Sequence, residues 1–295
     1  MRNDAFEAAR AQGVIDTFLS MPTRDAELAK KYDWIRASTM DAGSRTMEMP
    51  AEYMFKGVPR FGDDVPDPVD FVLALMDHFG IERMLVGWDE NEHAQRAIKE
   101  FPDRFFGMAT PNPNIGMEGV RRLERAVRDH GLACAHVWGA GLVPQVALND
   151  KRMYPLYAKC VELDIPILLY AGVPGPRIPM RALEVGLIDE VCWFFPELKI
   201  VLRHGAEPDT DLAVKLLLKW PNLYYSTSAF APKYYPDDIV EFANTRGADK
   251  VMYAGYFSAG LGLDRIFDEL PNVPFRDHVW PKFLRENALR VFNLS

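Results

Sequence analysis

The stretch IPILLYAG, residues 165–172, is a continuous apolar run of strand length with Tyr170 near its end. A second run of the same kind, KIVLRHG at residues 199–205, carries His204 near its end. Continuous apolar runs that alternate with helical segments are typical of parallel strands buried on both faces. The two runs therefore predict a parallel sheet whose strands are connected by helices.

Six further runs of this kind occur along the chain, and longer helical patterns separate several of them. The runs are VIDTFL (14–19), RMLVG (83–87), FFGMATP (105–111), ACAHVWG (133–139), LYYSTSA (223–229) and KVMYAGY (250–256). The helical patterns are NEHAQRAIKEF (91–101), GMEGVRRLERAVRDH (116–130), RMYPLYAKCVEL (152–163) and DTDLAVKLLLKW (209–220). Eight strand–helix units predict a (β/α)8 barrel of the α/β class, and a doubly wound open sheet is the alternative.

One long segment, residues 21–68, interrupts this rhythm. It is rich in Met, Pro and aromatic residues and shows little periodicity. We expect one barrel domain over residues 1–295, with residues 21–68 as an irregular insertion after strand 1. Long irregular segments in compact domains are usually functional, so we expect a lid or the contact of a homodimer. A surface excursion with no role is the alternative.

The composition excludes several classes of protein. The chain has 295 residues and a net charge of −8, and a nucleic-acid-binding protein would show a basic face instead. The three cysteines form no C-x-x-C pair, which argues against a zinc knuckle or a disulfide framework. The N-terminal stretch is polar, and no apolar run is long enough to span a membrane. We therefore expect a cytoplasmic protein with a small-molecule substrate and no nucleic-acid or membrane partner.

Five segments together resemble the amidohydrolase-2 group of the amidohydrolase superfamily, which contains aminocarboxymuconate semialdehyde decarboxylase and related aromatic-acid decarboxylases. They are VIDTFLS, IPILLYAG, LKIVLRHGAE, VMYAGYF and FLRENALRVFNL, in the order and at the spacing of that group. The resemblance covers residues 14–294. It implies the barrel fold already predicted and an enzyme that acts on a small carboxylate.

The resemblance also implies where a divalent metal would be held. In the family, strand one ends I-D-x-H-x-H, strand five ends in a histidine and strand eight ends G-S-D. These ligand positions correspond here to Phe18, Ser20, Tyr170 and Tyr256, while the strand-six histidine is retained as His204. Zinc and related metals need imidazole, thiolate or carboxylate ligands, so we expect no metal and no other cofactor.

Three residues are the predicted catalytic groups. At the end of its strand, His204 would face the barrel axis and act as a general acid or base. Tyr170 and Tyr256 would donate hydrogen bonds to a developing oxyanion, or act as general acids if their pKa were lowered. Alternatively, the two rings only fill the volume of the lost metal site.

Six more residues are predicted to bind the substrate. Phe18 and Ser20 lie at the mouth of the barrel. His136 and Trp138 alternate along one strand and share a face, which points either inward or toward the helices. Two further residues follow strands, and each has a structural alternative: Arg177 could grip a carboxylate or lie at the surface, and Ser226 could bind the ligand or cap a turn.

Together with the resemblance, these residues predict a metal-independent enzyme that acts on a small aromatic or unsaturated carboxylate, either as a lyase (a decarboxylase) or as a hydrolase. Amide hydrolysis is disfavoured because no metal activates water. Two alternatives remain open. One is an inactive barrel that binds a small molecule, and the other is a hydrolase with a metal site rebuilt from His136, His204 and Glu207.

Overall fold

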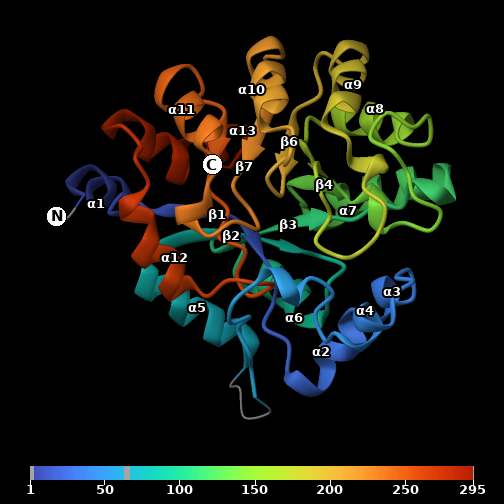
Figure 1. Cartoon of the computed structure of the whole chain (residues 1–295), viewed down its shortest axis with the longest axis horizontal. Coiled ribbons are helices and arrows are strands. Elements are labelled where there is room, and N and C mark those ends of the chain that lie inside the picture. The colour runs from blue at the N-terminus through green and yellow to red at the C-terminus, as the bar shows by residue number, and fades with distance from the viewer. Residues whose placement is uncertain (1–2, 63–66, 295) are drawn as a thin grey trace.

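The computed structural model describes residues 3–62 and 67–294 and contains one parallel eight-stranded sheet (Figure 1). The strands follow one another in the sheet in chain order, from β1 to β8. Their bounds are β1 Val14–Leu19, β2 Ile81–Gly87, β3 Phe105–Ala109, β4 Cys134–Val137, β5 Ile167–Tyr170, β6 Ile200–Arg203, β7 Leu223–Ser226 and β8 Val251–Met252. The predicted strands are thereby confirmed, and so is the barrel class.

The last strand returns to the first and nearly closes the barrel. The Thr17 amide donates to the Tyr253 carbonyl oxygen at 3.2 Å, and the Ser20 amide donates to that of Phe257 at 2.8 Å. A parallel bridge also joins Leu19 and Phe257. These contacts place the end of β1 beside the segment that follows β8, so Ser20 and Phe257 share one rim of the barrel.

Helices surround the barrel on its outside, as Figure 1 shows. Those that belong to the barrel are α1 Asp4–Arg10, α5 Pro68–Phe79, α6 Glu92–Glu100, α7 Met117–His130, α8 Tyr154–Glu162, α9 Ile188–Phe194, α10 Thr210–Lys219, α11 Asp237–Thr245, α12 Leu263–Glu269 and α13 Asn287–Val291. The four sequence patterns predicted as helices correspond to α6, α7, α8 and α10. Short 3-10 turns add η2 Pro113–Ile115, η3 Gly139–Gly141, η4 Arg181–Leu183, η5 Val185–Leu187, η6 Pro232–Tyr234, η7 Leu270–Asn272 and η8 Asp277–Val279. The segment η9 Lys282–Glu286 is a π-helix.

An apolar layer fills the part of the barrel interior that is farther from the carboxyl ends of the strands. Its members come from most strands and from α13, and they include Ile15, Leu85, Cys134, Leu168, Val201, Tyr224 and Met252. Side chains two positions apart on a strand point to the same side of the sheet. The residues two positions after Cys134, Leu168 and Val201 therefore also point inward, one layer closer to the carboxyl ends of the strands.

The insertion after β1 contains short helices, although its sequence shows little periodicity. They are α2 Asp25–Lys31, α3 Asp33–Arg36, α4 Ala42–Thr46 and the turn η1 Glu52–Met54. Figure 1 draws α2, α3 and α4 together beside the barrel, at its lower right. Part of the predicted insertion, residues 63–66, lies outside the described residues.

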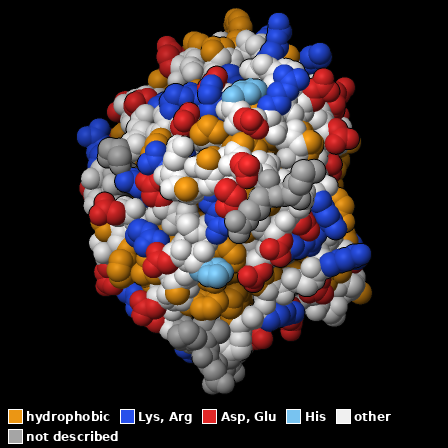
Figure 2. Space-filling view, turned by 90° about the vertical axis from the view of Figure 1, so that its left-hand side faces the viewer, with side chains coloured by type: hydrophobic (Ala, Val, Ile, Leu, Met, Phe, Trp, Pro, Cys, Tyr) orange, Lys and Arg blue, Asp and Glu red, His pale blue; other side chains and the backbone are white. Residues whose placement is uncertain are grey.

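Two features of the structure, the distribution of surface charge and the length of the helices, concern the partners predicted from the sequence. On the face drawn in Figure 2, acidic and basic side chains are interspersed, with apolar side chains between them. Within residues 3–62 and 67–294, we find no helix with the length and apolarity that a membrane span requires.

Candidate active site

The candidate site lies at the carboxyl ends of the strands, where active sites of (β/α)8 barrels are built. Its base is a layer of side chains that point inward from β4, β5, β6 and β7, namely His136, Tyr170, Arg203 and Ser226. Three of these side chains carry a buried atom without a hydrogen-bond partner: His136 Nε2, Arg203 Nε and Ser226 Oγ. The upper layer of the barrel is thus polar, whereas the layer beneath it is apolar.

Aromatic rings gather around Tyr170 of this layer and bring the predicted catalytic residues together. The rings of His204 and Tyr170 are stacked with 3.9 Å between their centroids, and those of His204 and Tyr256 meet edge to face at 4.9 Å. The Phe18 ring packs on Tyr256 at 4.5 Å. Tyr170, His204 and Tyr256 are partly exposed residues, whereas Phe18 is buried.

His204 is held by its backbone and by one serine. Its φ of 65° lies in the left-handed region, which non-glycine residues rarely adopt and which occurs often at functional sites. The Ser228 hydroxyl accepts from the His204 amide at 3.2 Å and is hydrogen-bonded to Nδ1 at 2.8 Å. Among the described residues, none hydrogen-bonds to Nε2 of His204, so this nitrogen is available to a ligand.

The His204 imidazole is neutral near pH 7. Burial lowers its pKa well below the usual value, and the charge of Arg203 and the His136 ring lower it further. The pKa of His136 is also well below its ordinary value, because of burial and then Arg203. Both rings therefore begin any reaction without a charge, as groups that can take up a proton.

The phenols of Tyr170 and Tyr256 keep their protons. Burial raises the pKa of both, well above the ordinary value for Tyr256, although the Arg203 charge acts in the opposite direction. A raised pKa favours the role of hydrogen-bond donor over that of general acid. Tyr256, like His204, has a left-handed backbone, with a φ of 60°. Within the part of the chain that is described, neither hydroxyl has a hydrogen-bond partner, nor does that of Tyr32.

Arg203 places a positive charge beneath these rings. The side chain is fully buried, and its Nη2 donates to the Thr17 carbonyl oxygen at 3.2 Å. Its Cζ lies 4.7 Å from the centroid of the Phe18 ring and 5.8 Å from that of Tyr170. Burial lowers the pKa of this guanidinium, but arginine stays protonated in proteins.

Asp16 is a fully buried residue of β1. One carboxyl oxygen accepts from the Phe18 amide at 3.0 Å and from the Gly255 amide at 2.8 Å. Burial raises its pKa to about 7, although the two amides, the Tyr253 hydroxyl and Arg203 act in the opposite direction. Near neutral pH this carboxyl is therefore only partly ionised.

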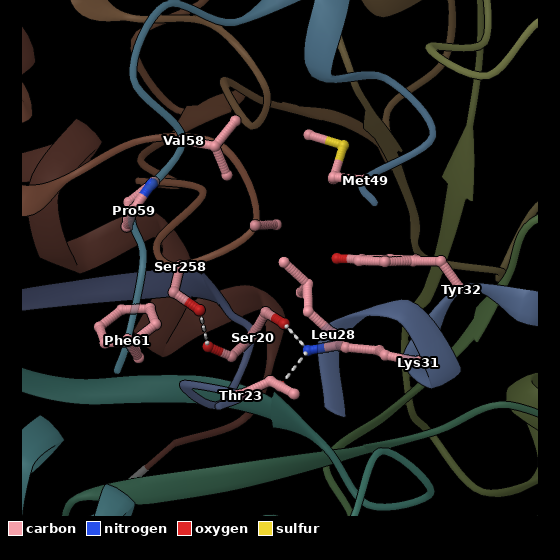
Figure 3. A pocket seen from close by; sticks show the side chains of 11 residues that line it. Ser20, Thr23, Leu28, Lys31, Tyr32, Met49, Val58, Pro59, Phe61 and Ser258 are labelled. Carbon is pink, nitrogen blue, oxygen red and sulfur yellow. Dashed lines mark hydrogen bonds between the residues drawn. The ribbon is translucent and has the colours of Figure 1, made fainter. Parts of the chain in front are cut away.

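Ser20 binds a lysine of the insertion rather than facing an open pocket. Lys31 Nζ donates to Ser20 Oγ at 2.7 Å and lies 2.6 Å from Glu90 Oε1, which also accepts from Ser20 Oγ at 2.6 Å. Figure 3 shows the ammonium pointing at Ser20 and Thr23. The pocket beside them measures about 10 Å³, which is room for a single water molecule.

The insertion packs over the aromatic cluster from two directions. Phe55 is stacked on Tyr256 at 5.6 Å, and Trp34 meets Trp138 edge to face at 5.5 Å. Phe55 also lines an open groove of about 550 Å³, whose other lining residues are Met47, Met49, Glu52, Tyr53, Gly57, Val58 and Arg60. Phe55 thus contacts Tyr256 of the candidate site and also lines this groove.

The remaining predicted residues divide into two groups. His136 and Trp138 both face the interior, because their rings lie 4.8 Å and 5.5 Å from that of Tyr170. Arg177 instead pairs with Asp41 of the insertion at 2.9 Å and lies over the Tyr53 ring, with its side chain 45% exposed. The Arg177 guanidinium thus connects the loop that follows β5 to the insertion.

The residues at the former ligand positions do not fit a divalent metal. Among the described residues, no three His, Cys, Asp or Glu side chains converge on one point, so the alternative site of His136, His204 and Glu207 is not formed. The Phe18 ring lies between Tyr256 and the guanidinium of Arg203. A second cation there would be repelled by Arg203 and would lack ligands.

Sequence reasoning missed three charged residues of the site, Arg203, Lys31 and Glu90. A signal existed for Arg203, because an arginine within the buried run KIVLRHG requires a specific environment. Lys31 and Glu90 lie 59 residues apart in the chain, and no local pattern connects them.

Comparison with known proteins agrees with this architecture. The model of the amidohydrolase family (Amidohydro_2) matches residues 39–294. The curated 2-keto-4-carboxy-3-hexenedioate hydratase of Sphingobium sp. SYK-6 is 26% identical over 151 residues. That match covers 45% of this chain and 44% of the hydratase, so less than half of the relative is aligned.

Solved structures share the fold at low sequence identity. An uncharacterised TIM-barrel protein of Bordetella bronchiseptica aligns with a TM-score of 0.71 and 19% identity, over 95% of this chain and 98% of its own. The 5-carboxyvanillate decarboxylase LigW2 of Novosphingobium aromaticivorans, solved with manganese, aligns with 0.66 and 17%, over 96% and 97%. The 4-oxalomesaconate hydratase LigJ of Rhodopseudomonas palustris aligns with 0.61 and 17%, over 95% of each chain.

Proposed function

Since this chain belongs to the amidohydrolase family of enzymes, we propose that it is a metal-independent lyase that decarboxylates a small aromatic or unsaturated carboxylate. The observation that supports this most directly is that the His204 ring lies 3.9 Å from that of Tyr170 and 4.9 Å from that of Tyr256, with no hydrogen bond from a described residue to His204 Nε2 or to either hydroxyl. A decarboxylase needs a proton carrier and donors for negative charge, and these groups supply both without a metal.

In the proposed reaction, neutral His204 first takes a proton from a substrate hydroxyl that is conjugated with the carbon bearing the carboxylate. The electron pair of the resulting oxyanion is delocalised onto that carbon, to which the imidazolium returns the proton. The bond between this carbon and the carboxylate then breaks, CO2 leaves, and the electron pair of that bond flows back through the conjugated system to the oxygen. Tyr170 and Tyr256 donate hydrogen bonds to the oxygen on which negative charge develops. The insertion would serve as a lid, because its Phe55 packs on Tyr256 and its Trp34 packs on Trp138.

Hydration of a conjugated double bond is the second candidate, and the similarity to the Sphingobium hydratase favours it. The same histidine would take a proton from water while the oxygen adds to one carbon, and would deliver that proton to the neighbouring carbon. In this reaction too, the imidazole of His204 would be neutral before it takes up the proton, because burial and the Arg203 charge lower its pKa.

The test is an assay of the purified protein with hydroxybenzoates and with unsaturated dicarboxylates. Released CO2 identifies decarboxylation, and loss of the conjugated absorbance without CO2 identifies hydration. We expect turnover that excess chelator does not change, that is lost in His204→Gln, and that is kept in the control His78→Gln on α5. Chelator-sensitive turnover that added metal restores would overturn metal independence. Binding of these compounds without turnover of any of them would identify the inactive barrel.

A further inference from the structure

The guanidinium of Arg203 is a buried charge without a counterion. No carboxylate of the described residues lies within ion-pair distance of it, and its Nε has no hydrogen-bond partner. Its partners are neutral: the Thr17 carbonyl oxygen, the Met108 sulfur at 3.7 Å from Nη1, and two aromatic rings. A buried charge that is not compensated is costly, so its retention at this position calls for an explanation.

Asp16 is the nearest candidate for a counterion, and it compensates the charge only in part. Its carboxyl interacts with Arg203 electrostatically, but its bonded oxygen is directed to the amides of Phe18 and Gly255. With a pKa of about 7, it is partly protonated near neutral pH. The faces of Phe18 and Tyr170 attract the cation through their quadrupoles, but they carry no net charge.

The other groups near Arg203 bring no negative charge at neutral pH. His136, His204, Tyr170, Tyr256 and Cys134 all interact with it electrostatically, and all are neutral. The polar layer of the barrel therefore has a net positive potential. An anion placed against the accessible rings of Tyr170 and His204 would meet this potential in surroundings that contain little water.

We infer that Arg203 is a positioning residue that makes the site selective for anions, and that the carboxylate of the substrate is its missing counterion. The guanidinium acts through space, since it is fully buried and the Phe18 and Tyr170 rings lie against it. This inference rests on the proposed carboxylate substrate, and it names the residue that distinguishes that substrate from a neutral compound of the same shape. An anion in contact with these rings would bind about tenfold more tightly than its neutral counterpart.

The experiment compares three probes of one shape and different charge: benzoate, benzamide and benzylammonium. Their dissociation constants are measured by calorimetry for the wild type, Arg203→Met, Arg203→Lys and the control Arg285→Met, whose arginine pairs with Glu82 at the start of β2. We expect the wild type to bind benzoate about tenfold better than benzamide, and benzylammonium least well. The benzoate-to-benzamide ratio should fall toward one in Arg203→Met and persist in Arg203→Lys and Arg285→Met.

The ratio separates an electrostatic role from a structural one. If Arg203 only supported the fold, its replacement would weaken benzoate and benzamide by the same factor, and the inference would be overturned while the proposed function stood. If the wild type does not prefer benzoate to benzamide, the carboxylate substrate of the proposed function is wrong, and this inference fails with it.

A second variant keeps the test decisive if Arg203→Met does not fold. Asp16→Asn removes the nearest negative charge and keeps an oxygen that can accept from the Phe18 and Gly255 amides. The benzoate-to-benzamide ratio should then rise above the wild-type ratio, and most strongly at pH 8, where Asp16 is ionised in the wild type. An unchanged ratio at pH 8 would contradict the inference.

Discussion

The imidazole of His204 is stacked on the phenol of Tyr170, with 3.9 Å between the ring centroids and 28° between the ring planes. The stack holds a neutral base beside a protonated phenol, with the nitrogen of the base still accessible. Ser228 fixes the other nitrogen of the imidazole. This relationship predicts distinct losses for the three residues involved.

His204→Gln should lower kcat by about a hundredfold or more, because glutamine can hydrogen-bond but cannot carry a proton at neutral pH. Ser228→Ala should have a smaller effect, about tenfold on kcat, since it removes the orientation of the imidazole but leaves its chemistry. Steady-state kinetics and the pH profile of kcat provide the measurement. Equal losses in both variants would show that the serine does more than orient the ring.

Tyr170→Phe and Tyr256→Phe should each lower kcat by about a hundredfold and change KM little, as donors to an oxyanion do. Each substitution removes a hydroxyl and retains the ring, so the aromatic cluster should remain packed. The comparison variant is Tyr234→Phe, at an exposed tyrosine of η6. If both site variants retained full kcat, the two rings would only fill space, as the structural alternative supposes.

Lys31→Met should loosen the packing of the insertion against the barrel. The substitution leaves Glu90 without its cation in a partly buried position, which costs about 1–3 kcal/mol. Urea unfolding and the rate of limited proteolysis within residues 40–60 measure the effect, with Lys30→Met as the control at an exposed neighbouring residue. In the double variant Lys31→Met/Glu90→Gln, part of the lost stability should return, because the unpaired carboxylate is also removed. No recovery would mean that the ion pair contributes little.

Asp16→Asn should change how the stability of the protein depends on pH. The raised pKa means that the native state binds more protons than the unfolded state between about pH 4 and pH 7. Wild-type stability from this group is therefore present at low pH and is lost as pH rises through that window. Relative to the wild type, Asp16→Asn should gain up to about 4 kcal/mol between pH 4 and pH 8. Urea unfolding of both proteins at these pH values tests the sign, and parallel pH curves would contradict it.

The two histidines of the candidate site, His136 and His204, should have the opposite effect on how stability depends on pH. Their pKa values are lowered on folding, so the unfolded state binds more protons below about pH 6.5. Stability from these groups is present above that pH and is lost as pH falls. We expect His136→Gln to reduce the acid sensitivity of unfolding, measured between pH 5 and pH 7 against His78→Gln on α5. An unchanged slope would show that His136 is not held neutral by the fold.

The parts of this protein that could be predicted are those encoded by short-range patterns. The apolar runs that end in Tyr170 and His204 identified two strands and two site residues together, because strand ends form the active face of a barrel. The insertion could not be resolved in the same way. Its helices are four to seven residues long, too short for a helical period to stand out.

The electrostatics of the candidate site could be predicted less well from the sequence, because they depend on contacts between residues that are far apart in the chain. The ion pair of Lys31 and Glu90 connects the insertion to the end of β2, and neither residue is unusual in its own segment. The environment of Arg203 depends on Thr17 of β1 and Met108 of β3, which only the closed barrel brings together. The pKa values of His204 and Asp16 follow from that burial, so they could not be inferred from residue type.

Arg203 and His204 are adjacent in the chain, yet the Arg203 guanidinium is fully buried, whereas the His204 imidazole lies among the aromatic rings and is the proton carrier that we propose. The left-handed backbone at His204 redirects the chain between the two side chains. Two consecutive residues therefore supply the buried charge and the imidazole of the candidate site. A search for genomes that encode an Arg-His-Gly triplet at the sixth strand, with tyrosines ending the fifth and eighth, would retrieve a subgroup that shares this fingerprint.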